Sequence, residues 1–137
     1  MNASGGTLKL GAGQNLTITG SAGTGAPDGT TGFIVSRGAT FELNGGTITA
    51  TGGSYVFTAG NTGGGTSNYI QNSGTFDAGS KEVLNAYGAA GNFTLNGGNF
   101  TAGEFRISQS ATGSVTLNGG VLTVNTLKSA NNTEIIN

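Results

Sequence analysis

The stretch FELNGGTIT at residues 41–49 decides the fold of this chain, because the chain repeats it. Related stretches follow at 69–77, 93–101 and 115–123, and a looser one precedes them at 8–19. Each consists of alternating apolar and polar residues, a bend of the Asn-Gly-Gly type, and a second alternating segment. Alternation with a period of two predicts a β-strand with one buried face. Internal repeats of about 20 to 50 residues predict a solenoid.

Three apolar columns appear when the copies are aligned on the bend. The first column contains Leu8, Phe41, Tyr69, Phe93 and Val115. The second contains Leu10, Leu43, Gln71, Leu95 and Leu117. The third contains Ile18 (with Leu16 as the alternative), Ile48, Phe76, Phe100 and Leu122.

The first-column residues lie 33, 28, 24 and 22 residues apart, which fits coils of unequal loop length. Helices are not expected, because no 3.6-residue period exists and glycine recurs every few residues. An antiparallel sandwich would not copy one motif laterally, whereas a parallel solenoid stacks like residues about 4.8 Å apart. We therefore predict an all-β, right-handed parallel β-helix of about five coils in a single domain, residues 1–137.

The bend holds an asparagine at the same place in four consecutive copies: Asn44, Asn72, Asn96 and Asn118. Asparagine tolerates left-handed backbone angles, and stacked amides can hydrogen-bond to one another along a column. The glycines that follow permit a tight corner. We interpret this corner ladder as structural rather than as a binding site.

A further strand is expected after each copy, at 33–35, 55–57, 83–84, 105–107 and 124–127. Two insertions interrupt the coils, at about 21–32 and 60–67, and we expect both to be surface loops. Residues 63–65 are all glycine, but they lack the Lys-Ser/Thr and helix start of a phosphate-binding loop.

Composition limits the possible functions. The chain contains 28 glycines, no cysteine and no histidine, and its net charge of −1 with scattered cations does not fit a nucleic-acid binder. The sequence contains no apolar run long enough to span a membrane, so we do not expect insertion into one. The six acidic residues form no catalytic pair, and we expect Glu82 and Glu104 to stack in a solvated charge cluster flanked by Lys81 and Arg106. We therefore expect no enzyme, no metal and no cofactor, with polysaccharide processing kept as a weaker alternative.

The Asn-Gly-Gly phrases, such as residues 43–49 and 115–123, resemble the repeats of bacterial autotransporter-type passengers and surface β-helix proteins. The resemblance covers roughly residues 7 to 127. It implies a right-handed β-helix, an extracellular or cell-surface location, and an adhesive or scaffolding role. Residues 1–6 lack the features of a signal peptide, so we expect an export signal elsewhere or a trimmed chain.

The ends of the repeat suggest how the chain functions. No capping element is visible, although solenoids normally need one. We predict that uncapped terminal coils dock head to tail and build a filament, through Leu8, Leu10, Leu127, Ile135 and Ile136. The alternative is an adhesive or scaffold module of a longer exported protein, which could bind a glycan or another cell-surface ligand. A weaker alternative is ice binding through the Thr-x-Thr pairs at 17–19 and 47–49.

Overall fold

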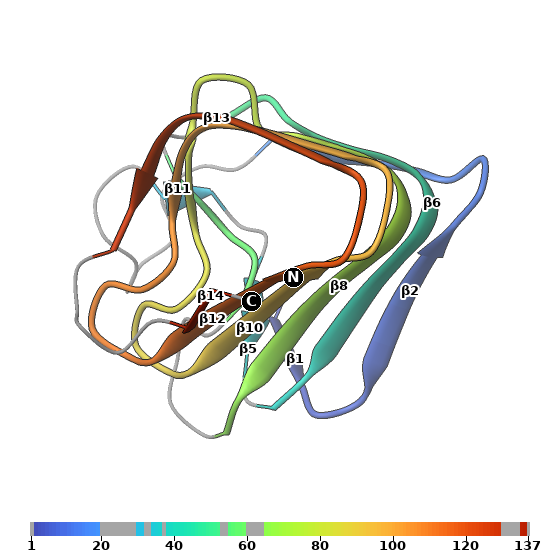
Figure 1. Cartoon of the computed structure of the whole chain (residues 1–137). Coiled ribbons are helices and arrows are strands. Elements are labelled where there is room, and N and C mark those ends of the chain that lie inside the picture. The colour runs from blue at the N-terminus through green and yellow to red at the C-terminus, as the bar shows by residue number, and fades with distance from the viewer. Residues whose placement is uncertain are drawn as a thin grey trace.

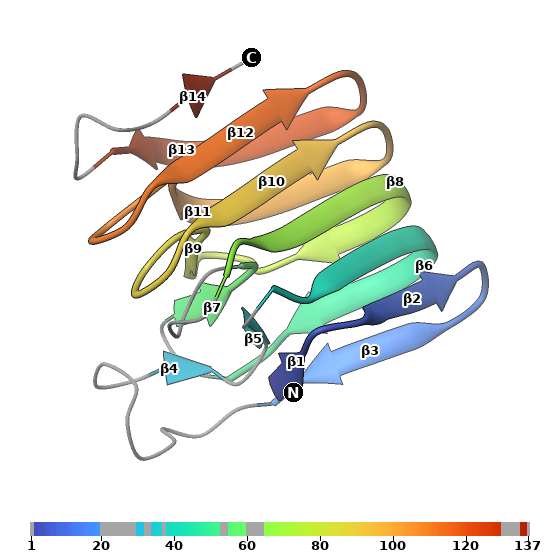
Figure 2. The same cartoon turned by 90° about the horizontal axis from the view of Figure 1, so that it is seen from below.

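The described part of the chain is an all-β solenoid. The computed structural model describes residues 2–19, 30–31, 34–36, 38–52, 55–59, 65–129 and 135–136, and none of these is helical. All strand pairs in this part of the chain are parallel. Figure 1 looks along the stack, where successive coils overlie one another, and Figure 2 turns it to show the strands side by side.

The strands form three ladders that run along the stack. The first ladder contains β2 (Thr7–Gly11), β6 (Thr40–Ala50), β8 (Ser67–Asp77), β10 (Gly91–Leu95), β12 (Gly113–Leu117) and β14 (Ile135–Ile136). The second contains β3 (Asn15–Ile18), the later parts of β6 and β8, β11 (Asn99–Arg106) and β13 (Val121–Lys128). The third contains β4 (Thr30–Thr31), β7 (Tyr55–Phe57), β9 (Glu82–Leu84) and the ends of β11 and β13. A separate two-stranded sheet joins β1 (Asn2–Ser4) to β5 (Ile34–Ser36).

Stacked aromatic rings fill the centre of the core. Tyr69 stacks on Phe93 at 5.2 Å between ring centroids, and Phe76 stacks on Phe100 at 4.5 Å. The two stacks meet edge to face, since the Phe93 and Phe100 planes cross at 82°. All four rings are 0% exposed. Parallel register therefore turns the repeated aromatic position into a continuous packed core, in the ring geometries that aromatic pairs prefer.

One polar side chain, Gln71, occupies the second column and is fully buried. Its Nε2 donates to the carbonyl oxygens of Gly74 at 3.1 Å and Asn99 at 3.0 Å. Its Oε1 accepts from the Tyr69 hydroxyl at 3.0 Å. Burial raises the pKa of Tyr69 well above its usual value, so this hydroxyl stays a donor. The column tolerates this amide in place of leucine, because each polar atom of the Gln71 side chain is hydrogen-bonded.

A positive backbone angle recurs at the last glycine of each bend. The φ angles are +78° at Gly46, +87° at Gly74, +80° at Gly98 and +81° at Gly120. A Cβ atom at Gly98 would also overlap the carbonyl oxygen of Gly74 in the preceding coil. Glycine is thus required twice here, by conformation and by the close approach of stacked backbones.

The register corrects two predicted alignments. Leu16, not Ile18, pairs with Ile48, because three residues separate the paired strands in the first bend and two in the next. Ile18 pairs with Ala50 and is still buried, since a shift of two residues keeps the side chain on the same face. The segment that pairs with Tyr55 and Val56 is β4, not residues 33–35.

Three further predictions need correction. Leu8 and Leu117 are 39% and 43% exposed rather than buried, because the described residues cover them from one side of the stack only. The expected loop at 21–32 includes strand β4, and residues 20–29 and 32 lie outside the described residues. The expected loop at 60–67 ends in Ser67, which begins β8 and is buried, and residues 60–64 lie outside the described residues.

Candidate functional site

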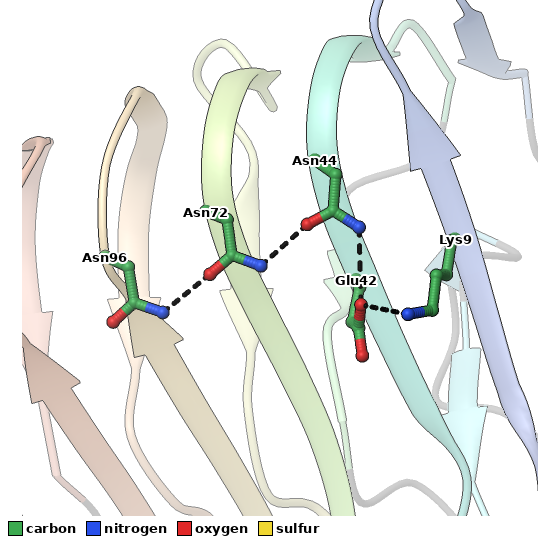
Figure 3. A network of polar contacts seen from close by, with 5 residues as sticks. All are labelled: Lys9, Glu42, Asn44, Asn72 and Asn96. Atoms are coloured by element: carbon green, nitrogen blue, oxygen red, sulfur yellow. Dashed lines mark hydrogen bonds and ion pairs between the residues drawn. The ribbon is translucent and has the colours of Figure 1, made fainter.

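The four bend asparagines form a chain of hydrogen bonds along one corner of the solenoid, and Figure 3 shows the first three of them. Asn72 Nδ2 donates to Asn44 Oδ1 at 2.6 Å, and Asn96 Nδ2 donates to Asn72 Oδ1 at 2.7 Å. Asn118 Nδ2 continues the chain by donating to Asn96 Oδ1 at 2.8 Å. Every donor points toward the preceding coil, so the chain of amides has a direction.

An ion pair lies at the N-terminal end of this ladder of asparagine amides. Asn44 Nδ2 donates to Glu42 Oε2 at 3.3 Å, and Lys9 Nζ lies 3.0 Å from the same oxygen. Lys9 and Glu42 are register partners, so this ion pair joins the first two coils. The hydrogen bonds from Lys9 and then from Asn44 lower the pKa of Glu42 below its usual value. At the other end of the amide ladder, no donor among the described residues reaches Asn118 Oδ1.

A second polar ladder runs along the first ladder of strands, near the beginnings of its strands, whereas the bend asparagines lie at the opposite side. Asn68 Nδ2 donates to Thr40 Oγ1 at 3.1 Å, and Asn92 Nδ2 donates to Asn68 Oδ1 at 2.9 Å. Ser114 Oγ extends the ladder to Asn92 Oδ1 at 2.6 Å. This ladder was not predicted from the sequence. Its signal was the polar residue that comes immediately before each first-column residue, from Thr40 before Phe41 to Ser114 before Val115.

The charged cluster on the third ladder is partly buried, whereas we expected a solvated one. Parallel register places Glu104 beside Glu82 and Arg106 beside Lys128. Arg106 Nε lies 2.7 Å from Glu82 Oε1, and Arg106 Nη2 lies 3.0 Å from Glu104 Oε1. Lys128 Nζ adds a contact of 2.7 Å to Glu104 Oε2. Lys81 contacts the described cluster through its backbone, because its carbonyl oxygen accepts from Glu104 N at 3.3 Å. The side chains of Arg106, Glu82 and Glu104 are 21%, 16% and 19% exposed.

The pKa values of the two glutamates in this cluster are shifted in opposite directions. Burial raises the pKa of Glu82, and the attraction of Arg106 offsets this only in part. Burial also acts to raise the pKa of Glu104, but the hydrogen bonds from Lys128 and Arg106 outweigh it, so the pKa of Glu104 is lowered. The cations thus hold both carboxylates in a structural network. The described residues contain no group of three or more His, Cys, Asp or Glu that could hold a metal ion.

Both ends of the described stack present strand edges (Figure 2), and exposed apolar residues lie on these edge strands. At one end, β2 and β3 pair only with β6 among the described strands, and Leu8 is exposed while Leu10 is half-buried. At the other end, β13 pairs only with β11 among the described strands, and Leu127 is 50% exposed. The remaining predicted contacts, Ile135 and Ile136, form β14, whose backbone pairs with Ser114 and Val115.

The register also changes the candidate ice-binding surface. The outward residues that align with Thr47 and Thr49 are Asn15 and Thr17, not Thr17 and Thr19. The same two rows continue through Thr75 with Asp77, Asn99 with Thr101, and Val121 with Thr123. Regular threonine pairs therefore do not extend along this face.

Comparison with protein-family models, with curated proteins and with solved structures found no match to the chain. No helix in the described residues is long and apolar enough to cross a membrane. The fold defines the class of protein as a parallel β-solenoid, and the function has to be argued from its surfaces.

Proposed function

We propose that this chain is a non-enzymatic extracellular structural protein whose solenoid subunits stack end to end into a filament. Its partner in this assembly is a second copy of the same chain. In this proposal the solenoid is right-handed, has about five coils and carries the Asn-Gly-Gly corner ladder. Five successive strands of the first ladder, β2, β6, β8, β10 and β12, support the count of about five coils.

The observation that carries the proposal is the change in burial along two core columns. In the second column Leu43, Gln71 and Leu95 are at most 1% exposed, whereas Leu117 at the end is 43% exposed. In the column that ends at Leu127, the preceding Phe105 is 0% exposed and Leu127 is 50% exposed. Each residue is thus buried where a coil covers it on both sides. A further coil is the surface that would bury the end residues.

A second copy can supply that coil, because both ends present parallel strand edges. In this arrangement the first half of β13 of one copy would pair with β3 of the next. In the same register β4 of the next copy would lie over Leu127 and β2 over Leu117, so both leucines would lose their contact with water. Burying the exposed half of each such leucine contributes about 1 kcal/mol. A contact between two different ends is heterologous, so without rotational closure it grows into a filament. The loss of free motion on association makes this growth dependent on concentration.

Electron microscopy and sedimentation over a range of protein concentrations test the proposal. We expect filaments of the unmodified chain, and loss of assembly in Leu127→Asp, because the new carboxylate would be buried between coils. Val121→Asp is the matched control. Val121 is 55% exposed on the same terminal strand but aligns with the outward residue Asn99, so this variant should still assemble.

Particles that stay monomeric at every concentration would overturn the filament proposal, as would equal assembly of the two variants. Circular dichroism of both variants ensures that a loss of assembly does not arise from a loss of fold.

The second candidate is an adhesive or scaffold module of a longer surface protein. The specific observation in its favour is that β14 of the same chain pairs with β12 and so continues the first ladder. Further coils of one chain could cover β13 equally well. A screen against soluble glycans tests this candidate: binding by a strictly monomeric chain would support it over the filament, and no binding to any glycan would count against an adhesive role.

A further inference from the structure

Three bends of this chain contain a dipeptide that is chemically reactive. Asn-Gly occurs at 44–45, 96–97 and 118–119 and nowhere else in the sequence. In such a dipeptide the glycine backbone nitrogen can attack the asparagine side-chain carbon Cγ. A new C–N bond closes a succinimide ring, the bond from Cγ to Nδ2 breaks, and ammonia leaves with the proton of the backbone nitrogen. Water from the solvent then opens the ring to aspartate or isoaspartate.

The structure holds the three asparagine amides to different degrees. Asn44 donates to Glu42 and accepts from Asn72, and Asn96 donates to Asn72 and accepts from Asn118. Both amides are therefore fixed at nitrogen and at oxygen. Among the described residues, Asn118 is fixed through Nδ2 alone, since none of them donates to its Oδ1.

The attacking nitrogen does not distinguish the two later bends. Gly97 N donates to the Gln71 carbonyl oxygen at 3.3 Å, and Gly119 N donates to the Leu95 carbonyl oxygen at 3.2 Å. The backbone is equivalent in both bends, so the difference in reactivity arises at the amide. Ring closure has to swing Cγ toward the backbone, which breaks two side-chain hydrogen bonds at Asn96 and only one at Asn118.

We infer that Asn118 is a spontaneous deamidation site of the folded protein, and that the amide ladder protects Asn44 and Asn96 from the same reaction. The fold keeps the reactive dipeptide because it needs the glycine. A Cβ atom at residue 119 would lie 2.7 Å from the carbonyl oxygen of Asn96, closer than real contacts allow. The inference concerns the single chain and does not depend on filament formation.

The products would alter the end of the stack. Aspartate at 118 has no Nδ2 donor, so the hydrogen bond to Asn96 Oδ1 is lost and a negative charge faces an acceptor oxygen. Isoaspartate also lengthens the backbone between residues 118 and 119, where both amide nitrogens bond to Leu95. If subunits stack as proposed above, this reaction would weaken the docking end of ageing molecules.

Peptide mapping by mass spectrometry after incubation at mildly alkaline pH tests the inference, with dilute, monomeric protein. We expect the amide-to-acid conversion at residue 118 to be about fivefold faster than at residue 96, the factor that one net hydrogen bond confers. Equal rates at the two residues, or a faster rate at residue 96, would overturn the inference.

Asn118→Ala separates the protection by the ladder from fraying of the last coil. This variant removes the donor to Asn96 Oδ1, which leaves Asn96 held as Asn118 is held in the unmodified chain. We expect the rate at residue 96 to rise about fivefold, with the rate at residue 44 unchanged as the internal control. An unchanged rate at residue 96 would mean that the ladder gives no protection. Neither of these outcomes depends on whether the chain forms filaments, so the inference stands or falls separately from the Leu127→Asp assay.

Discussion

Two leucines in one core column allow the cost of an uncovered end to be measured. Leu95 and Leu117 pair directly in register, but Leu95 is 1% exposed and Leu117 is 43% exposed. Truncating a buried leucine to alanine removes its transfer free energy and leaves a cavity, which together cost about 3 kcal/mol. At residue 117 little more than half of the side chain is buried, and water can enter the space. The expected cost of Leu117→Ala is therefore about 1 kcal/mol.

Urea unfolding of dilute protein, followed by circular dichroism, measures both costs. We expect the free energy of unfolding to fall by about 2 kcal/mol more in Leu95→Ala than in Leu117→Ala. The slope with urea should be similar in both variants, since nearly the same surface becomes exposed. Equal losses would refute the reasoning, because they would mean that residue 117 is covered in solution. A cost of Leu117→Ala that grows with protein concentration would trace this cover to a second copy.

Two further predictions concern the charged cluster and the backbone contacts between coils. The pKa of Glu104 is lowered in the folded protein, so its contribution to stability is lost as the pH falls through that value; Glu104→Gln should flatten the acid limb of a stability-against-pH curve. The pKa of Glu82 is raised, so its contribution is present at low pH and lost as the pH rises, and Glu82→Gln should steepen the same limb. A steeper limb in Glu104→Gln, or a flatter one in Glu82→Gln, would contradict the corresponding assignment. Gly113→Ala should cost about 3 kcal/mol in urea unfolding, because its methyl group would overlap the Ile107 carbonyl oxygen, whereas Gly11→Ala meets only an ordinary side-chain contact and should change stability by less than about 0.5 kcal/mol.

The class of fold was predictable because the sequence repeats the pattern that creates it. The alternation around Phe41 and Leu43 recurs around Phe93 and Leu95, so a parallel stack with one apolar interior follows from the sequence alone. The register of the first coil was not predictable to the residue. Leu16 and Ile18 both point inward, and only the count of bend residues in three dimensions decides which of them pairs with Ile48.

The polar surface was predictable only where one residue type recurs without change. Stacked asparagines such as Asn72 and Asn96 stand out in an alignment, whereas the ladder from Thr40 to Ser114 mixes three residue types that share only the capacity to hydrogen-bond. The burial of Arg106 between two glutamates also escaped the sequence, because it depends on neighbouring coils that cover the long side chains.

The sequence by itself determined what stacks: a repeated strand, a bend and a column of like side chains, all of which follow from local alternation and glycine chemistry. Only the tertiary structure decided which members of each column are buried. Burial in a solenoid depends on the coils above and below rather than on the residue, so Leu95 is enclosed and Leu117, in the same motif, is not. The same rule separates Asn96 from Asn118, since Asn96 bonds to an amide on each side and Asn118 bonds to a single one among the described residues.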